Sequence, residues 1–432
     1  MFFLYNSLLL LATAALAPLP ILILLFRRKQ RHIFFERCAL NYTDSLSNFT
    51  RRPFWIHAVS VGEVMASIQL IRELKRRFPE HPVVLSTTTA TGNATARTHA
   101  KTADAIIYFP FDFPFIVSCA LQRIQPALFL SIETEIWPNL YSALQNRDIP
   151  ALIVSGRISE KSFKNYHALR FFFRRVLGTV SRFCMQTQSD ADRITSIGAP
   201  KNLVSVCGNI KFDLHIPAVP PTEKNELLKQ FGLSSEQPIL IAGSTHRGEE
   251  QQVLDAFLEM QKEVPELMLL LAPRHPERFN EAAETIAALN LNCIRRTALH
   301  DGARRTNEPV ILLDSIGELV KIYSIGTVIF IGGSLVEGIG GHNPLEPALA
   351  GKPVIFGPHM SNFKEIARIL TTKKAAFQID SPAALVAKTL ELLRSPDLRA
   401  SIATAACDVI QHNSGAVKKI ADTVESVLQQ HS

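Results

Sequence analysis

The chain has 432 residues, of which 47% are hydrophobic and 20% charged, and its formal net charge is +7. The length exceeds one ordinary core and the apolar content excludes wholesale disorder, so at least two domains are expected. The positive charge suits phosphates or an anionic membrane surface, but it is too small to indicate a nucleic-acid-binding protein.

The N-terminus predicts a membrane anchor over residues 1–30. Residues 8–26 are almost wholly apolar, and four basic residues follow between positions 27 and 31. A helix rising about 1.5 Å per residue over this run would cover the hydrocarbon core of a bilayer. A cleavable signal peptide is the alternative, but Pro18 directly follows the cleavage-like Ala15-Leu16-Ala17 and no basic residue precedes the run. The positive-inside rule places the body in the cytoplasm.

The body alternates apolar strand-like runs with amphipathic stretches, which is typical of parallel sheets covered on both faces. The first series of runs lies at 54–59, 83–85, 105–109, 127–132, 151–154 and 183–186. The second lies at 238–242, 267–272, 310–313, 327–331, 353–356 and 375–379. Two doubly wound Rossmann-like α/β domains facing a cleft are therefore predicted, at 31–213 and 238–432, with a proline-rich linker at 214–237 and helices at the C-terminus.

Acidic residues follow two strands of the first domain. Glu63 ends the segment Ser60-Val61-Gly62-Glu63, which opens the first helix, and its carboxylate could take a proton from an acceptor hydroxyl. We expect the helix dipole to keep Glu63 ionised, although an ordinary glutamate of a first helical turn is the alternative. Glu133 and Glu135 follow another strand, where one of them could instead cap the next helix. Lys211, near the domain end, could reach a leaving phosphate or simply be solvated.

Three loops of the second domain could hold a nucleotide. Arg274 closes a strand and could bind phosphate bidentately. Gly317 begins another strand-to-helix turn, and the glycine-rich stretch 337–346 offers backbone N–H groups and a helix N-terminus near Asn343. Glu346 could accept two ribose hydroxyls. The alternative is a glycine-rich turn between two strands.

A basic and aromatic stretch lies within the first domain. It includes Phe171-Phe172-Phe173-Arg174-Arg175, and it could dip into a lipid headgroup region. A core helix with a basic rim is the alternative. The six cysteines form no C-x-x-C pair, which indicates buried thiols in a reducing compartment, and no zinc spacing or Walker loop predicts a metal or cofactor.

Five motifs together resemble one family. Ser-Val-Gly-Glu, Glu-Thr-Glu-x-Trp-Pro-Asn, Gly-Asn-x-Lys-Phe-Asp, Ala-Pro-Arg-His-Pro-Glu-Arg and Gly-Gly-His-Asn-Pro-Leu-Glu resemble, in this order, those of the 3-deoxy-D-manno-octulosonic acid (Kdo) transferases of lipopolysaccharide synthesis. The resemblance covers essentially the whole chain, anchor included. It implies a GT-B fold, no metal requirement, and transfer of Kdo from CMP-Kdo to the lipid A precursor at the cytoplasmic face of the inner membrane.

The resemblance also implies residue roles. Glu63 would be the general base, and Glu133 and Lys211 would stabilise the transition state. The CMP site would comprise Pro273, Arg274, Gly317, Glu318, Leu319, Asn343, Pro344, Leu345 and Glu346. One base and no obvious covalent nucleophile favour a single displacement with inversion, with nucleophilic attack by Glu133 as the alternative.

Two other functions compete with this interpretation. One is a membrane-associated GT-B enzyme that uses a nucleoside diphosphate sugar. The other is a sugar-nucleotide-binding protein without catalysis, although the charged groups at strand ends favour an enzyme. The motifs are compatible with one Kdo transfer or with several.

Overall fold

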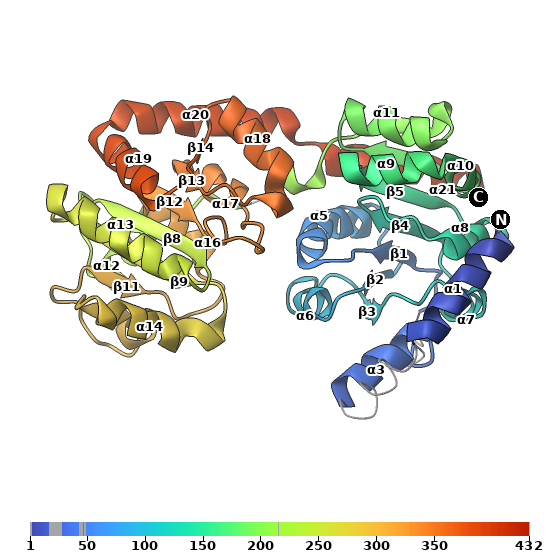
Figure 1. The fold of residues 1–432 in the computed structure, drawn as a ribbon, viewed down its shortest axis with the longest axis horizontal. Helices are drawn as coiled ribbons and strands as arrows, with labels where there is room; N and C mark the ends of the chain where they lie inside the picture. Colours follow the sequence, from blue (N-terminus) through green and yellow to red (C-terminus); the bar gives the residue numbers. More distant parts are fainter. Residues whose placement is uncertain (1, 17–27, 43–45, 47–48, 215, 432) are drawn as a thin grey trace. The chain divides into compact units, whose positions relative to one another are not determined.

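The computed structural model describes residues 2–16, 28–42, 46, 49–214 and 216–431 of the chain. It divides the chain into two compact units, one comprising residues 1–214 and 413–432 and the other residues 215–412 (Figure 1). Each unit is an α/β body built on its own parallel sheet.

The first unit contains a seven-stranded sheet in the order β3-β2-β1-β4-β5-β6-β7. Every neighbouring pair is parallel. Its strands are β1 (Phe54–His57), β2 (Val83–Thr87), β3 (Ala105–Tyr108), β4 (Leu128–Ile132), β5 (Ala151–Gly156), β6 (Arg182–Met185) and β7 (Val204–Val206). The strand order reverses between β1 and β4, and in such sheets ligands bind outside the carboxyl ends of the strands at this point.

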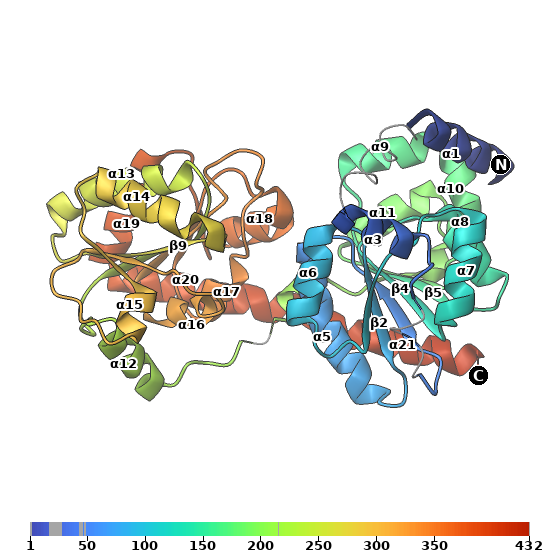
Figure 2. The ribbon, with the colours of Figure 1, turned by 90° about the horizontal axis from the view of Figure 1, so that it is seen from below.

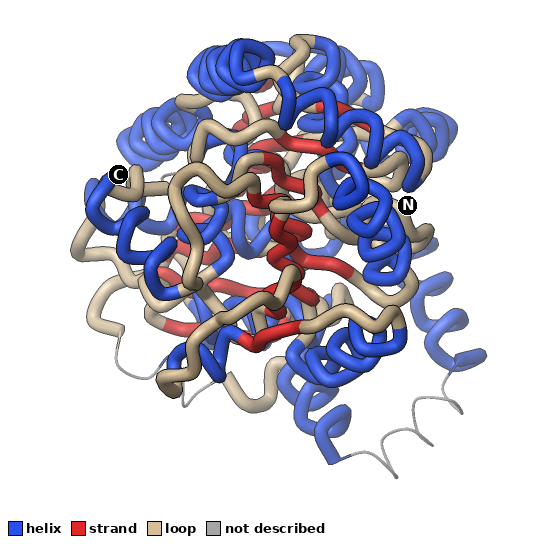
Figure 3. The backbone as a smooth tube through the Cα atoms, turned by 90° about the vertical axis from the view of Figure 1, so that its left-hand side faces the viewer, coloured by secondary structure: helices blue, strands red, loops and turns tan. Residues whose placement is uncertain are grey.

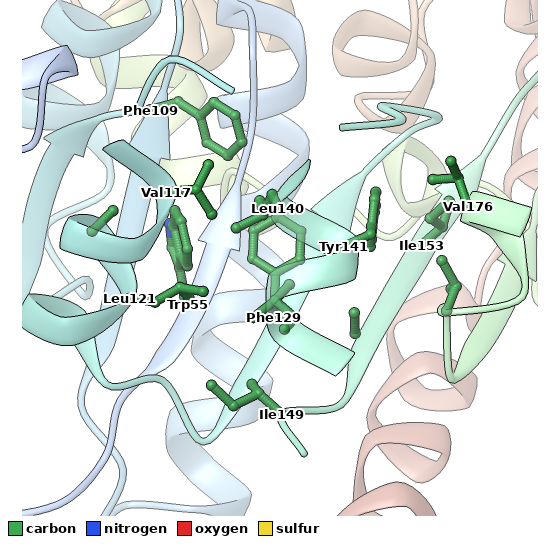
Figure 4. Packing of buried hydrophobic residues seen from close by; sticks show 14 of the residues in the cluster. Trp55, Phe109, Val117, Leu121, Phe129, Leu140, Tyr141, Ile149, Ile153 and Val176 are labelled. Atoms are coloured by element: carbon green, nitrogen blue, oxygen red, sulfur yellow. The ribbon is translucent and has the colours of Figure 1, made fainter. Parts of the chain in front are cut away.

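Both faces of the first sheet are covered, which explains why its strands read as continuous apolar runs. On one face Trp55, Phe129 and Ile153 pack with helix residues such as Leu140 and Tyr141 (Figure 4). On the other face the alternate strand residues pack against helices α5 and α21. The helices of this unit are α1 (Phe2–Leu16), α3 (Arg28–Arg37), α5 (Val61–Arg77), α6 (Ala90–His99), α7 (Pro114–Ile124), α8 (Pro138–Gln145), α9 (Glu160–Ala168), α10 (Arg170–Leu177), α11 (Gln188–Ile197) and α21 (Ala416–His431), with 3-10 turns η1 (Lys201–Leu203) and η2 (Ile210–Phe212).

Helix α1 lies against α8 and α10 of the first unit (Figures 1 and 2). The Tyr5 ring stacks on Phe172, and the Asn139 side-chain amide donates to Asn6 over 2.7 Å. Residues 17–27 of the predicted anchor lie outside the described residues. Among the helices that the structure describes, none combines the length and apolarity needed to cross a bilayer.

The second unit contains a second seven-stranded parallel sheet, in the order β10-β11-β9-β8-β12-β13-β14 (strands red in Figure 3). Here the order reverses between β8 and β12. The strands are β8 (Ile239–Thr245), β9 (Met268–Pro273), β10 (Cys293–Arg295), β11 (Val310–Leu312), β12 (Val328–Ile331), β13 (Val354–Phe356) and β14 (Phe377–Gln378).

One face of this sheet packs against helices α13, α14 and α19 through a single apolar cluster. The helices of the second unit are α12 (Pro221–Gln230), α13 (Glu249–Glu263), α14 (Phe279–Ala288), α15 (Arg296–His300), α16 (Leu319–Ile322), α17 (Leu345–Leu349), α18 (Lys364–Thr372), α19 (Pro382–Arg394) and α20 (Pro396–Asn413), with 3-10 turns η3 (Pro276–Arg278), η4 (Tyr323–Ile325) and η5 (Ser361–Phe363).

The unit boundaries differ from the predicted domains in two places. Helix α12 occupies the middle of the predicted linker 214–237, because Pro220 and Pro221 begin a helix rather than continue an extended segment. The C-terminal segment 413–432, predicted to belong with the second domain, is part of the first unit. Its apolar face, which includes Ile420 and Val424, completes the core over α5.

All twelve strands predicted from apolar runs are present, whereas β7 and β10 were not predicted. Both have three residues and lie at sheet edges, where polar and apolar side chains mix and the apolar signal is weak.

The attachment of α21 depends on Asp213. The Asp213 carboxylate accepts hydrogen bonds from the backbone N–H groups of Gly415 and Val417, the latter over 2.6 Å. It therefore acts as a cap for a helix about 200 residues further along the chain.

Replacing Asp213 with Ala should lower the unfolding free energy of the first unit by about 1–2 kcal/mol, because two helix N–H groups lose their acceptor. Urea unfolding followed by circular dichroism measures this change. Asp422→Ala, on α21, is the matched control, since the half-exposed Asp422 carboxylate forms only a surface ion pair with Arg77 of α5. Equal urea midpoints for the two variants would contradict the capping role.

Candidate active site

Glu63 is held rigidly at the reversal point of the first sheet. Strand β1 ends at His57, and α5 begins at Val61 after the N-cap Ser60. One Glu63 carboxylate oxygen accepts the backbone N–H of Val59 over 2.8 Å, and the other accepts the Ser60 hydroxyl over 2.8 Å. Glu63 accepts both hydrogen bonds, while the Ser60 side chain caps no N–H of the helix, so the Glu63 side chain is fixed against the turn that precedes α5 at the carboxyl edge of the sheet.

Glu133 follows β4, the neighbouring strand across the reversal point. Its backbone has φ +60°, in the left-handed region that non-glycine residues rarely adopt, and such strain typically costs 1–3 kcal/mol. The Lys211 ammonium lies 2.9 Å from the Glu133 carboxylate, and both side chains are largely shielded from solvent. The structure therefore brings together Glu63, Glu133 and Lys211, as the sequence predicted.

Glu135 is a third carboxylate at the same edge. The sequence left open whether it capped the next helix, but Asp112 has that role, because its carboxylate accepts the N–H groups of Asn139 and Leu140 in the first turn of α8. Among the described residues no hydrogen bond or ion pair reaches the Glu135 carboxylate, although Tyr141 donates to its backbone carbonyl. Sequence reasoning noted Glu135 but gave it no catalytic role.

Burial raises the pKa of two of these carboxylates to near neutral pH. It raises the pKa of Glu63 to about 7, and the nearby charge of Glu133 acts in the same direction. Burial also raises the pKa of Glu135 to about 7, with further contributions from Glu63 and Glu133. The helix dipole was expected to keep Glu63 ionised, but desolvation outweighs the hydrogen bonds that favour the anion and shifts the pKa of Glu63 upward. A carboxylate with this pKa is suited to general-base catalysis near neutral pH.

In the second unit, a buried carboxylate binds the turn that precedes the glycine-rich stretch 337–346. Glu249, the first residue of α13, accepts the backbone N–H groups of Gly333, Ser334 and Leu335 over 2.6–3.0 Å. It also accepts the N–H of His246 over 3.2 Å. These N–H groups hold the loops after β8 and β12 together, so they are not available to a phosphate.

The helix N-terminus predicted near Asn343 is also poorly suited to bind a phosphate. Helix α17 has only five residues, and its first N–H is already hydrogen-bonded to the Asn343 side chain over 3.0 Å. Glu346 is half-buried and accepts a hydrogen bond from the Asn343 amide over 3.2 Å. Burial raises the pKa of Glu346, while Arg274 opposes that shift.

Arg274 lies at the carboxyl end of β9 with an exposed side chain. Its backbone N–H is bonded to Thr245 over 3.0 Å, and no ion pair of its guanidinium occurs among the described residues. It is therefore free to bind an anion. Pro273 is the last residue of β9, directly before Arg274.

The loop after β11 is arranged differently. The Glu318 carboxylate accepts hydrogen bonds from the buried Arg296 guanidinium, over 3.0 Å, and from Ser315. Burial disfavours its ionisation, but these hydrogen bonds outweigh burial and lower the pKa of Glu318 to about 2. The Glu318 side chain is thus structural, and any nucleotide contact by Gly317-Glu318-Leu319 would use other atoms.

Two histidines at this edge were not predicted as site residues. His246 follows β8 and His342 precedes the short helix α17, and their Nε2 atoms lie 2.8 Å apart. Their positions after strands were visible in the sequence, but their contact depends on the fold. Among the described residues, no group of histidine, cysteine and acidic side chains is arranged to hold a metal ion.

Comparisons with known proteins identify the relatives of this chain. Residues 27–214 match the family described as 3-deoxy-D-manno-octulosonic-acid transferase (kdotransferase). The chain is 35% identical to a 3-deoxy-D-manno-octulosonic acid transferase of Haemophilus influenzae over 385 residues, covering 87% of each chain. It is 33% identical to the Bordetella pertussis transferase of the same name, again with 87% of each covered.

A solved structure shares the fold. A glycosyltransferase from Rickettsia africae ESF-5 superimposes with a TM-score of 0.57 at 14% identity, covering 88% of this chain and 99% of that one. At this identity the likeness concerns the fold alone, and it supports the predicted two-domain architecture.

Replacing Glu63 or Glu135 with Gln should stabilise the protein at pH 8. Folding raises the pKa of both groups from 4.5 to about 7. The protonated carboxyl groups therefore contribute their full stabilisation of the folded state below pH 4.5, and this stabilisation is lost as the pH rises through 7. Each variant should therefore gain about 1–3 kcal/mol over the wild type at pH 8, and the gain should vanish near pH 5.

Thermal unfolding at the two pH values measures this difference. The control is Glu73→Gln on the same helix, since hydrogen bonds from Arg76 and Arg77 lower the pKa of Glu73 to about 2 and its loss should destabilise at pH 8. A lower melting temperature for Glu63→Gln than for the wild type at pH 8 would show that burial does not raise the pKa of Glu63.

Proposed function

The chain belongs to the 3-deoxy-D-manno-octulosonic acid (Kdo) transferase family, and on that premise we propose that it is an inverting glycosyltransferase that moves Kdo from CMP-Kdo to the lipid A precursor. The relatives establish the transferase class and the sugar. The proposal adds the donor, the acceptor and the stereochemistry of the reaction, and it allows one or more Kdo units to be added.

The observation that carries the proposal is the Glu63 carboxylate. It is fixed by two hydrogen bonds, has a pKa of about 7, and lies at the reversal point of the first sheet beside Glu133 and Lys211. An acceptor hydroxyl is a weak nucleophile, so a positioned base that removes its proton as the new bond forms typically contributes 10² to 10⁴-fold in rate. We assign that role to Glu63.

The Glu133–Lys211 ion pair favours a single displacement. Attack by Glu133 on the anomeric carbon would compete with this ion pair, since one Glu133 oxygen is bound to Lys211. The paired groups are better suited to stabilising the oxocarbenium-like sugar and the departing phosphate. Attack by the acceptor on the opposite face would then invert the anomeric centre.

The donor nucleotide is assigned to the second unit. The exposed Arg274 guanidinium can bind a phosphate in a bidentate manner, and Asn343, Pro344, Leu345 and Glu346 lie on the neighbouring loop. The half-buried Glu346 carboxylate suits the ribose hydroxyls. Gly317, Glu318 and Leu319 would contribute backbone atoms, since the Glu318 side chain is occupied by Arg296.

The acceptor is a lipid, so we propose that the first unit works at the cytoplasmic face of the inner membrane, with residues 8–26 as a single-pass anchor. The described part of the N-terminal helix exposes Phe3, Leu4, Leu8, Leu10 and Leu11. On α10, Phe171 is 79% exposed, whereas Phe172 packs on Tyr5 and Phe173 on Tyr166. Of the three phenylalanines in the predicted patch, Phe171 is therefore the one placed to enter the headgroup region.

The central test is transfer from CMP-Kdo, generated in situ, to a tetraacylated lipid A precursor, with products read by mass spectrometry. The wild type should add Kdo, and Glu63→Ala should lower the rate by about 10² to 10⁴-fold because the base is lost. The number of added masses reports how many units are transferred.

Thermal shifts with CMP, UDP and ADP accompany this assay. Stabilisation by CMP alone supports the donor, whereas stabilisation by UDP or ADP would favour an enzyme that uses a nucleoside diphosphate sugar. A folded, CMP-binding wild type that forms no product would overturn the proposed acceptor.

Membrane contact is tested by Phe171→Trp in the full chain reconstituted with brominated lipids. The new indole should be quenched strongly, because an aromatic ring at this position would lie at the headgroup level. The control is Val206→Trp, which introduces the same ring at an exposed position of edge strand β7. Equal quenching of the two indoles would contradict contact between α10 and the membrane surface.

A further inference from the structure

His246 and His342 form a hydrogen-bonded pair at the reversal point of the second sheet. His246 directly follows β8, and His342 lies in the loop after β12. Their Nε2 atoms are 2.8 Å apart, and the two rings are nearly parallel, at 10°. The ring of His275, which follows β9, lies edge-on to His246 with centroids 5.3 Å apart. Three strand ends thus direct imidazoles to one place.

The loops are shaped to bring the two rings together. Gly333 has φ +65°, and a Cβ at this position would lie 3.2 Å from His342 and 3.3 Å from His246. The buried Glu249 carboxylate fixes this segment by accepting the N–H groups of both Gly333 and His246. The pair is therefore a built feature of the loops rather than a chance contact of mobile side chains.

The charges around the pair are predominantly positive. Arg274, His275 and Arg278 all act on His246, and Arg274 and His275 also act on His342. Burial, aided by these charges, lowers the pKa of His246 to about 4 and that of His342 to about 3. Both rings are neutral at pH 7 when no anion is bound.

The neighbouring carboxylates are committed elsewhere. Glu249 binds backbone N–H groups, Glu250 pairs with Arg278 over 2.7 Å, and Glu346 accepts from Asn343. Glu277 lies at the edge, 4.0 Å from His275. An incoming anion could therefore pair with Arg274 and with a protonated ring of the pair.

The pair can accept a proton without losing its internal hydrogen bond. Between two neutral imidazoles, one Nε2–H donates to the bare Nε2 of the other ring, so the donating ring has an unprotonated Nδ1. Among the described residues neither Nδ1 has a hydrogen-bond partner. A proton added to that Nδ1 gives an imidazolium that still donates to its partner, now through a stronger charge-assisted bond.

We propose that His246 and His342 form the phosphate subsite of the donor site, and that the pair takes up one proton from solvent when a nucleotide phosphate binds beside Arg274. The inference rests on the proposed CMP-sugar donor. When the bond between the sugar and the phosphate oxygen breaks, the phosphate gains one negative charge, and the imidazolium already in place balances it. The proton stays on the pair until CMP departs.

The test is calorimetry of CMP and cytidine binding to the full chain between pH 6 and 8, in buffers of different ionisation enthalpy. Wild type should bind CMP with net proton uptake, and its affinity should fall by up to about tenfold per pH unit as the pH rises. His246→Gln and His342→Gln should bind CMP more weakly at pH 6 and lose most of this uptake. His412→Gln, at an exposed position on α20, should behave as the wild type.

The comparison between variants matters because the CMP phosphate itself titrates near pH 6, equally for every protein form. Identical uptake in the wild type and both glutamine variants would overturn the role of the pair while leaving the CMP donor intact. Uptake with cytidine equal to that with CMP would overturn the phosphate assignment. Failure of the folded wild type to bind CMP would instead overturn the donor proposal on which the inference rests.

A measurement on the unaltered protein guards against misfolded variants. Imidazole ¹⁵N NMR spectra of the wild type should show one additional protonated ring nitrogen when CMP is added at pH 6.5. Spectra in which both rings stay neutral in the CMP complex would refute the proposal.

Discussion

Burial of ionisable groups at the carboxyl ends of two parallel sheets is the constraint on which the chemistry of this protein depends. In the first unit it raises the pKa of Glu63 and Glu135 toward neutrality. In the second it lowers the pKa of His246 and His342. Desolvation penalises whichever form is charged, so it moves acids and bases in opposite directions. Both sites therefore contain groups that are ready to gain or lose a proton when a partner arrives.

The parallel sheets explain why these groups gather where they do. Each sheet reverses its strand order next to its first strand, between β1 and β4 and between β8 and β12. At such a point the connecting helices diverge to opposite faces, which leaves the loop ends uncovered. Glu63 and Glu133 follow the two strands of the first pair, and His246 and His342 follow those of the second. The same topology thus generates an acidic edge in one unit and a basic edge in the other.

Carboxylates in this protein serve two distinct purposes. Asp112, Asp213 and Glu249 bind backbone N–H groups and fix helix starts or loops. Their hydrogen bonds favour the charged form, but burial still raises the pKa of Asp112 to about 6 and raises that of Glu249. Among the described residues the Glu135 carboxylate accepts no hydrogen bond, and Glu63 accepts one backbone N–H and one hydroxyl, which do not offset its burial. Both lie at the carboxyl edge of the first sheet, where the strained backbone of Glu133 also lies.

The sequence alone predicted the two parallel-sheet α/β domains, and it supplied the candidate site residues. Continuous apolar runs revealed every long strand, since a parallel sheet buried on both faces demands them. Motif positions identified Glu63, Glu133, Lys211 and Arg274, because strand ends are visible in the chain.

The tertiary structure decided the features that depend on contacts between segments far apart in the chain. The pKa of Glu63 depends on burial by distant elements, although its local helix start predicted an ionised group. Glu249 accepts backbone N–H groups 84 to 86 residues away, in the turn that precedes the glycine-rich stretch 337–346. The docking of α21 through Asp213 and the pairing of His246 with His342 likewise join residues far apart in the chain. Desolvation and long-range hydrogen bonds arise only when separate segments pack together, and for that reason they were beyond the reach of spacing and composition.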